Sequence, residues 1–161
     1  MVIMDFNHFD ERGNSIMVDV SGKQPTLRTA IAAAEVHMSV ELLAAIRNSA
    51  IAKGDVLGVA RLAGIMAAKR TPDLIPLSHP LAIHSVAVDF EQDAVAGRIE
   101  IRCTVRAFER TGVEMEAMTG AAVAALTVYD MCKGSDKSVS IGTIRLLLKE
   151  GGKSGLYRRE E

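Results

Sequence analysis

Two runs of alternating apolar and polar residues, separated by a short turn, constrain the fold of this chain more than any other feature. The first run covers residues 83–90 and the second covers residues 99–107, and each places apolar side chains at every second position. Such alternation is typical of a strand that buries one face and leaves the other in water. Residues 93–97 lie between the runs and include the Asp and Gly that turns favour. The sequence therefore predicts an antiparallel hairpin with one wet face.

Three helices are predicted around this hairpin. The longest covers residues 113–133, which are rich in Ala and free of Pro. A short helix is predicted directly after Ser39, whose hydroxyl can cap it. Another begins after Asp55 and stops before Pro72, because proline cannot continue a helix. The two shorter helices also have apolar residues three and four positions apart.

Two further strands complete the predicted sheet. Residues 27–38 are rich enough in Ala for a helix, but Pro25 and the alternation of apolar with polar residues allow a strand, which we favour. Residues 139–149 are predicted to form the last strand. The resulting order is strand, helices, strand, strand, helix, strand. It predicts the α+β class, specifically a ferredoxin-like sandwich in which helices cover one face of an antiparallel sheet.

The chain is predicted to be one domain. Its 161 residues are close to the usual size of a single domain, and no repeat or linker divides them. We expect an N-terminal arm over residues 1–15 and a flexible, basic tail over residues 150–161.

The composition excludes several classes of partner. Nineteen basic and twenty acidic residues give a net charge of -1, so an anion site requires a local cluster of cations. Four Phe, two Tyr and no Trp supply few stacking surfaces, so we expect no nucleic acid partner. No apolar run reaches the ~18 residues of a membrane span, and the N-terminus lacks the pattern of a secretory signal. We therefore expect no membrane partner and a soluble, cytoplasmic protein.

Three groups of polar residues are candidate sites, each with a simpler explanation. Lys53 precedes a helix N-terminus, where it is either a solvated lysine or a phosphate ligand. Lys69 ends the same helix, where a cation is favourable without a ligand. Ser78 and His79 lie in a loop that flanking prolines stiffen. A lone histidine is more often structural than catalytic, although a rigid loop can place an imidazole for chemistry.

The long predicted helix carries a fourth group. Glu114 and Glu116 lie at its start, and Asp130 and Lys133 lie at its end. Asp130 and Lys133 are three residues apart, so the simpler interpretation is a surface ion pair. The residues around them are mostly apolar, which predicts that the pair is partly buried. A buried Asp and Lys can act as base and acid.

Two other functions are not supported by the motifs. The Gly-Gly-Lys-Ser letters at 151–154 suggest a phosphate-binding P-loop, but that motif needs a glycine where Leu147 stands and a helix afterwards. The four histidines show no paired ligand spacing, so no metal site is expected.

Seven motifs, in register along the chain, together resemble those of one family. They are Met17-Val-Asp-Val20, Lys53-Gly-Asp55, Ala63-Gly-Ile-Met-Ala-Ala-Lys-Arg-Thr71, Asp73-Leu-Ile-Pro-Leu-Ser-His-Pro80, Thr111-Gly-Val-Glu-Met-Glu-Ala117, Val123-Ala-Ala-Leu-Thr-Val-Tyr-Asp-Met-Cys-Lys133 and Gly151-Gly-Lys-Ser-Gly155. The family is the MoaC family of molybdenum cofactor biosynthesis, the cyclic pyranopterin monophosphate synthases. The resemblance runs from about residue 16 to residue 155.

This resemblance implies a lyase that works on a pterin precursor derived from GTP. The expected substrate is 3′,8-cyclo-7,8-dihydroguanosine triphosphate, and the expected products are cyclic pyranopterin monophosphate and pyrophosphate. No cofactor is implied, and whether Mg²⁺ accompanies the triphosphate is left open. The expected assembly is a homohexamer built as a trimer of dimers, with the site at the dimer interface.

The resemblance also assigns roles to residues. Asp130, Lys133 and Lys53 match the catalytic positions. The positions expected to bind substrate are Leu77, Ser78, His79, Glu114, Met115, Glu116, Arg28, Lys69 and Lys149. Family members usually carry Cys where this chain has Ser78, so a required thiol is not expected at that position. The alternative from another class is a non-catalytic nucleotide-binding or regulatory module, which would keep the cations but would not turn substrate over.

Overall fold

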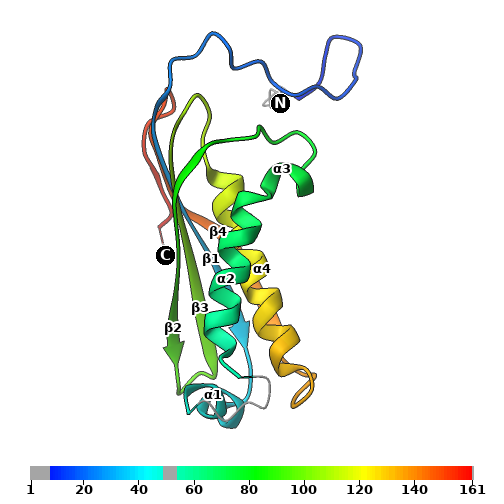
Figure 1. The fold of residues 1–161 in the computed structure, drawn as a ribbon, viewed down its shortest axis with the longest axis vertical. Helices are drawn as coiled ribbons and strands as arrows, with labels where there is room; N and C mark the ends of the chain where they lie inside the picture. Colours follow the sequence, from blue (N-terminus) through cyan, green and yellow to red (C-terminus); the bar gives the residue numbers. More distant parts are fainter. Residues whose placement is uncertain (1–7, 49–53, 161) are drawn as a thin grey trace.

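The computed structural model describes residues 8–48 and 54–160, which form a sheet and a layer of helices on one of its faces (Figure 1). The strands are β1 (Thr26–His37), β2 (Ile83–Asp93), β3 (Arg98–Glu109), β4 (Ser140–Glu150) and β5 (Tyr157–Arg158). The helices are α1 (Val40–Arg47), α2 (Val56–Lys69), α3 (Thr71–Leu74) and α4 (Glu114–Cys132). The sheet order is β2-β3-β1-β4-β5, and every neighbouring pair is antiparallel. The predicted α+β, ferredoxin-like class is confirmed.

The predicted elements form where the sequence places them. The hairpin is β2 and β3, and the ambiguous segment 27–38 is a strand, β1, because its alternate residues pack beneath the helices. The side chain of Ser39 caps α1 by accepting a hydrogen bond from the backbone N–H of Leu42 at 3.2 Å. Asp55 caps α2 in the same way, accepting from the N–H of Gly58 at 2.8 Å.

The structure contains two elements that the sequence did not predict. After α2 ends, α3 makes one further turn that includes Pro72, which is tolerated at the start of a helix. The buried hydroxyl of Thr71 donates to the carbonyl oxygen of Ala68 at 3.0 Å and links the two helices. Within the expected tail, the two residues of β5 pair with β4, so this part of the tail adds a strand to the sheet.

The core lies between the sheet and the two long helices. Small side chains on β1, namely Ala30, Ala32 and Ala34, are fully buried and let the helices lie close to the sheet. None of the described helices covers the opposite face of the sheet (Figure 1). Of the helices that the structure describes, none has the length and apolar character needed to cross a membrane.

Candidate functional site

Six of the residues predicted to bind substrate line one cavity, at the end of the molecule where α4 begins. This cavity, which we call the loop cavity, has a volume of about 300 Å³. Its described walls are His8, Val18, Val20, Lys23, Leu77, Ser78, His79, Leu81, Thr111, Gly112, Glu114, Met115 and Glu116. The structure therefore brings together Leu77, Ser78 and His79 with the first turn of α4, although about 35 residues of sequence separate them.

A second cavity adjoins the first and contains two more predicted residues. This cavity, which we call the basic cavity, has a volume of about 840 Å³ and shares Lys23, Thr111, Gly112 and Glu114 with the loop cavity. Its other described walls are Gln24, Thr26, Arg28, Arg110, Lys149, Gly152, Lys153 and Ser154. Among these described walls, five basic side chains face a single acidic one, so a chain with almost no net charge concentrates positive charge here, as binding an anion requires.

Glu116 is the most buried ionisable residue of the loop cavity, with 2% of its surface exposed. Its Oε1 atom has no hydrogen-bond partner among the described residues. Burial is the main cause that raises the pKa of Glu116 to about 6, and the charge of Glu114 acts in the same direction. Hydrogen bonds from its own backbone and from Ser78 oppose this rise. A carboxyl with this pKa can hold or release a proton near neutral pH.

His79 is oriented by the segment that precedes β1. Its Nε2 lies 2.7 Å from the carbonyl oxygen of Val18, and because a carbonyl can only accept, Nε2 carries the hydrogen. Pro76 and Pro80 restrict the backbone on both sides. The imidazole is therefore held in one direction at the wall of the loop cavity.

The two predicted cations of the basic cavity are also held by hydrogen bonds. Arg28 is 8% exposed, and its Nε and Nη2 donate to the carbonyl oxygens of Glu109 and Arg110, both at 3.1 Å. The ammonium of Lys149 donates to the hydroxyl of Ser154. Ordered cations of this kind are suited to binding phosphate groups.

The predicted catalytic pair lies at the other end of α4. Lys133 Nζ is 2.6 Å from Asp130 Oδ1, and this hydrogen bond together with the charge of Asp130 raises the pKa of Lys133. The side chains are 51% and 58% exposed, so the predicted partial burial is wrong for the single chain. The apolar neighbours that suggested burial, such as Val128 and Cys132, face the core, whereas Asp130, Lys133 and Leu126 lie on the outer stripe of the helix.

The two remaining predicted residues do not join these groups. Lys53 lies outside the described residues, so its position stays a prediction. Lys69 is exposed in the last turn of α2, and the described walls of the two cavities do not include it.

The predicted site residues therefore fall into two groups at opposite ends of one helix. Glu116 and Asp130 are both within α4, fourteen residues apart, and a rise of 1.5 Å per residue separates them by about 21 Å. In Figure 1, α4 runs along most of the helical layer. One small ligand cannot contact both groups in the same chain.

Lys23, Arg110 and Lys153 of the basic cavity were not singled out from the sequence. Lys23 and Arg110 are single charged residues in loops, with no spacing pattern to mark them. Lys153 lies in the Gly-Gly-Lys-Ser motif of the tail, but that motif suggests a P-loop, which the chain does not have. The fold brings these cations together because Arg110 directly follows β3, which ends beside the start of β1.

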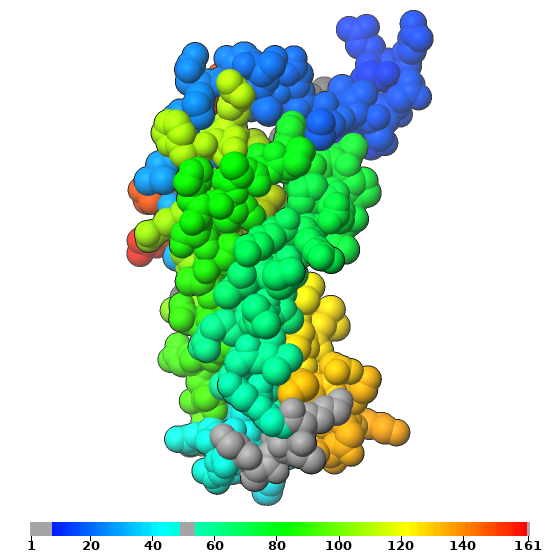
Figure 2. Space-filling view, in the orientation of Figure 1, coloured from blue at the N-terminus to red at the C-terminus, as the bar shows by residue number. Residues whose placement is uncertain are grey.

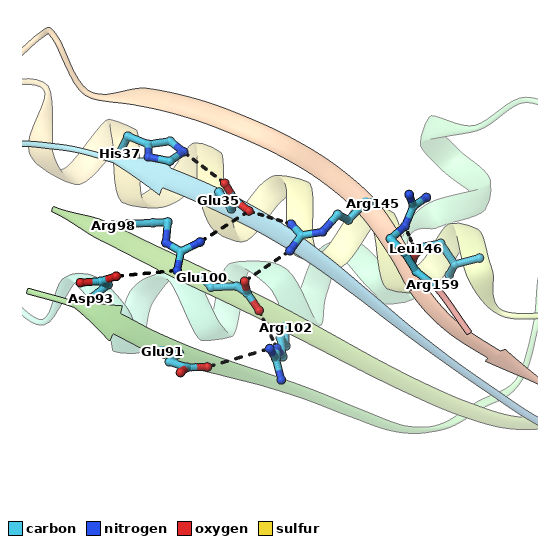
Figure 3. A network of polar contacts seen from close by, with 10 residues as sticks. All are labelled: Glu35, His37, Glu91, Asp93, Arg98, Glu100, Arg102, Arg145, Leu146 and Arg159. Atoms are coloured by element: carbon cyan, nitrogen blue, oxygen red, sulfur yellow. Dashed lines mark hydrogen bonds and ion pairs between the residues drawn. The ribbon is translucent and has the colours of Figure 1, made fainter. Parts of the chain in front are cut away.

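A further polar cluster lies on the uncovered sheet face (Figure 3). Several of its residues line a hollow of about 830 Å³. Arg145 binds Glu35 at 2.9 Å and Glu100 at 3.4 Å, and Arg102 binds Glu100 at 2.7 Å. Burial acts to raise the pKa of Glu100, but Arg102 and Arg145 outweigh it and lower the pKa. Each of these two carboxylates therefore has an arginine partner. Across residues 8–48 and 54–160, no three His, Cys, Asp or Glu side chains are grouped as a metal ion requires.

Comparison with known proteins gives consistent results along the chain. The model of the MoaC family matches residues 17–152. A cyclic pyranopterin monophosphate synthase of Pelobacter propionicus is 81% identical over 98% of this chain and 99% of its own length. The proteins of that name from Geobacter sulfurreducens and Roseiflexus castenholzii are 70% and 55% identical, over 98% and 94% of this chain and 99% and 96% of their own lengths.

Proposed function

The chain belongs to the MoaC family, and we propose that it catalyses the cyclic pyranopterin monophosphate synthase reaction of molybdenum cofactor biosynthesis. The substrate is 3′,8-cyclo-7,8-dihydroguanosine triphosphate, and the products are cyclic pyranopterin monophosphate and pyrophosphate. No cofactor is part of the proposal, because the rearrangement and cyclisation require proton transfers and no net oxidation or reduction. A cytoplasmic location belongs to the same proposal.

The observation that supports this function best is the pair of adjoining cavities. The substrate has an uncharged ring system and a charged triphosphate. The basic cavity is rich in cations, whereas the walls of the loop cavity include several apolar side chains, such as Leu77 and Met115. The basic cavity offers Arg28 and Lys149 to the phosphates, and the loop cavity offers Ser78, His79 and Glu116 to the ring system. The two cavities adjoin at Lys23, Thr111, Gly112 and Glu114, so the proposal places one substrate molecule across both.

The ion pair at the end of α4 suits the proton transfers of the reaction. Lys133 is a proton donor in contact with a carboxylate, and Asp130 can accept a proton from the substrate. Release of pyrophosphate places negative charge on the leaving group, which the cations of the basic cavity stabilise. Lys53 is assigned to the same chemistry by the family resemblance.

The separation of the two groups leads us to propose that the site is shared between subunits. In the proposed dimer, the two-fold axis runs across the middle of α4, so that the start of α4 of one subunit lies near the end of α4 of its partner. The helical layer carries exposed apolar side chains that suit such an association, including Leu62 on α2 at 62% exposure and Leu126 on α4 at 55%. Figure 2 shows these two helices on the outer face of the molecule. The proposed assembly is a homohexamer, a trimer of these dimers.

Turnover by the purified protein tests the proposed function. The substrate is added to the full chain, and both cyclic pyranopterin monophosphate and pyrophosphate are measured. Lys133→Ala should lower the rate by roughly 10² to 10⁴, the effect of removing a general acid or base, while substrate still binds. Lys137→Ala is the matched control, because Lys137 is exposed and four residues away. Binding without turnover by the native protein would instead indicate a nucleotide-binding module.

A further inference from the structure

The tail motif that does not fit a P-loop forms an ordered turn beside the basic cavity. Residues 151–155 follow β4 directly, and β5 then pairs back on β4, so the sheet holds both ends of the turn. Within the turn, the N–H of Gly155 donates to the carbonyl oxygen of Gly152 at 3.2 Å. Gly152 and Ser154 both line the basic cavity.

Gly152 lies directly against the guanidinium of Arg28. A Cβ atom at position 152 would lie 1.6 Å from Nη1 and 2.5 Å from Cζ of Arg28, far inside van der Waals contact. Gly152 also has a φ of +75°, which side chains disfavour. Arg28 cannot move away without losing its hydrogen bonds to the carbonyls of Glu109 and Arg110. The position of the guanidinium therefore depends on the absence of a side chain at residue 152.

Two further contacts fix the turn and its second cation. A Cβ atom at Gly151 would lie 2.1 Å from the carbonyl oxygen of Leu27, so this glycine lets the turn approach the residue before Arg28. The hydroxyl of Ser154 accepts a hydrogen bond from the ammonium of Lys149. The turn thus contacts both cations that the family resemblance places in the substrate pocket.

We propose that residues 151–154 of this turn form a positioning element for pyrophosphate, in which Gly152 sets the direction of Arg28 and Ser154 sets that of Lys149. This role rests on the proposed function, since pyrophosphate is the leaving group of that reaction. Fixing flexible cations before the anion arrives reduces the entropy that binding would otherwise lose. Gly152 and Ser154 act through the two cations and are positioning residues.

Binding of inorganic pyrophosphate to the full-length protein, measured by calorimetry, tests this role without turnover. Gly152→Ala should weaken binding about tenfold, because the new methyl group displaces the guanidinium. Gly155→Ala is the matched control: Gly155 lies in the same turn with a φ of +65°, but apart from its chain neighbours no atom of the described residues lies within 4 Å of its added Cβ. It introduces the same kind of backbone strain and should keep the affinity within about twofold.

Two more variants separate positioning from a general effect on the fold. Ser154→Ala leaves the backbone unchanged and should weaken pyrophosphate binding about threefold, while Ser154→Thr, which keeps the hydroxyl, should restore it. In an Arg28→Gln background, Gly152→Ala should cause no further loss, because its effect passes through Arg28. Ser154→Ala also tests the proposal if Gly152→Ala fails to fold.

Each contrary result has a distinct meaning. Equal losses in Gly152→Ala and Gly155→Ala, or a loss from Gly152→Ala that persists without Arg28, would overturn the positioning role. A native protein that turns substrate over but does not bind pyrophosphate would overturn it too, with the proposed function intact. A protein that binds pyrophosphate with the expected pattern but makes no product would support the positioning role and contradict the proposed function.

Discussion

Gly64 of α2 and Gly120 of α4 face each other where the two helices pack together. A Cβ atom at Gly64 would lie 2.9 Å from the carbonyl oxygen of Gly120, and one at Gly120 would lie 2.6 Å from the sulfur of Cys103 on β3. The backbone of α4 is therefore close to both α2 and the sheet at this level. The close approach sets the direction of α4, and with it the positions of both groups of site residues.

Gly120→Ala should destabilise the protein by about 1–3 kcal/mol, the usual effect of adding a methyl group to a packed core. Alanine is the better helix former, so a loss of stability would show that packing outweighs helix propensity at this position. Denaturant unfolding measures the free energy directly. Gly22→Ala should change it little, because no described residue beyond the chain neighbours of Gly22 lies within 4 Å of the added Cβ. Equal stability of the two variants would contradict the close approach.

Glu116→Gln should change how stability depends on pH. Burial raises the pKa of Glu116 from 4.5 to about 6 in the folded chain, so the folded state binds this proton more tightly than the unfolded state. The stability that the protonated carboxyl contributes is complete below pH 4.5 and is lost as the pH rises through 6, a change of about 2 kcal/mol. The variant should match the native protein near pH 4 and exceed it by about 2 kcal/mol at pH 7.

Unfolding curves at several pH values and one protein concentration provide this measurement. Glu41→Gln serves as the control, because Glu41 is exposed in the first turn of α1. Its effect should stay within about 0.3 kcal/mol across the range. A constant difference between Glu116→Gln and the native protein from pH 4 to 7 would rule out a raised pKa for Glu116.

The sequence predicted the fold well because its signals are local. Alternation identified β1 despite its high Ala content, and Ser39 and Asp55 marked the starts of two helices. The predicted burial of Asp130 and Lys133 failed because a mostly apolar segment does not show which stripe of the helix faces the core. The basic cavity could not be predicted from the residues alone, since its cations come from four separate segments of the chain.

Ser78→Cys should change turnover little while giving the protein a reactive thiol. The two native cysteines, Cys103 and Cys132, are fully buried, and burial, with a smaller effect from the charge of Asp89, raises the pKa of Cys103 to about 12. Native protein should therefore resist alkylation at pH 8, whereas S78C should react at one site, which a substrate analogue that fills the loop cavity can protect. Mass spectrometry counts the modified thiols. A much faster enzyme would show that a thiol at position 78 takes part in the reaction.

Two inactive variants should restore activity to each other if the site is shared between subunits. Glu116 and Asp130 are about 21 Å apart along one helix, and α4 already includes Glu114, so a later start of the helix cannot bring Glu116 closer to Asp130. Glu116→Ala and Asp130→Ala are refolded together at equal concentration. Random pairing makes half of the dimers mixed, and each mixed dimer contains one intact site out of two, so roughly a quarter of native activity should return.

The matched control combines Asp130→Ala with Lys133→Ala. Both residues lie at the same end of α4, 2.6 Å apart, so each site takes both from one chain. Mixing these variants leaves every site with one defect, and no activity should return. Differential tags on the two chains show whether mixed dimers have formed. If mixed dimers form and the mixture of Glu116→Ala and Asp130→Ala stays inactive, both residues serve a site within one chain. In that case α4 must change its conformation when substrate binds, because a straight helix keeps the two residues too far apart for one small molecule.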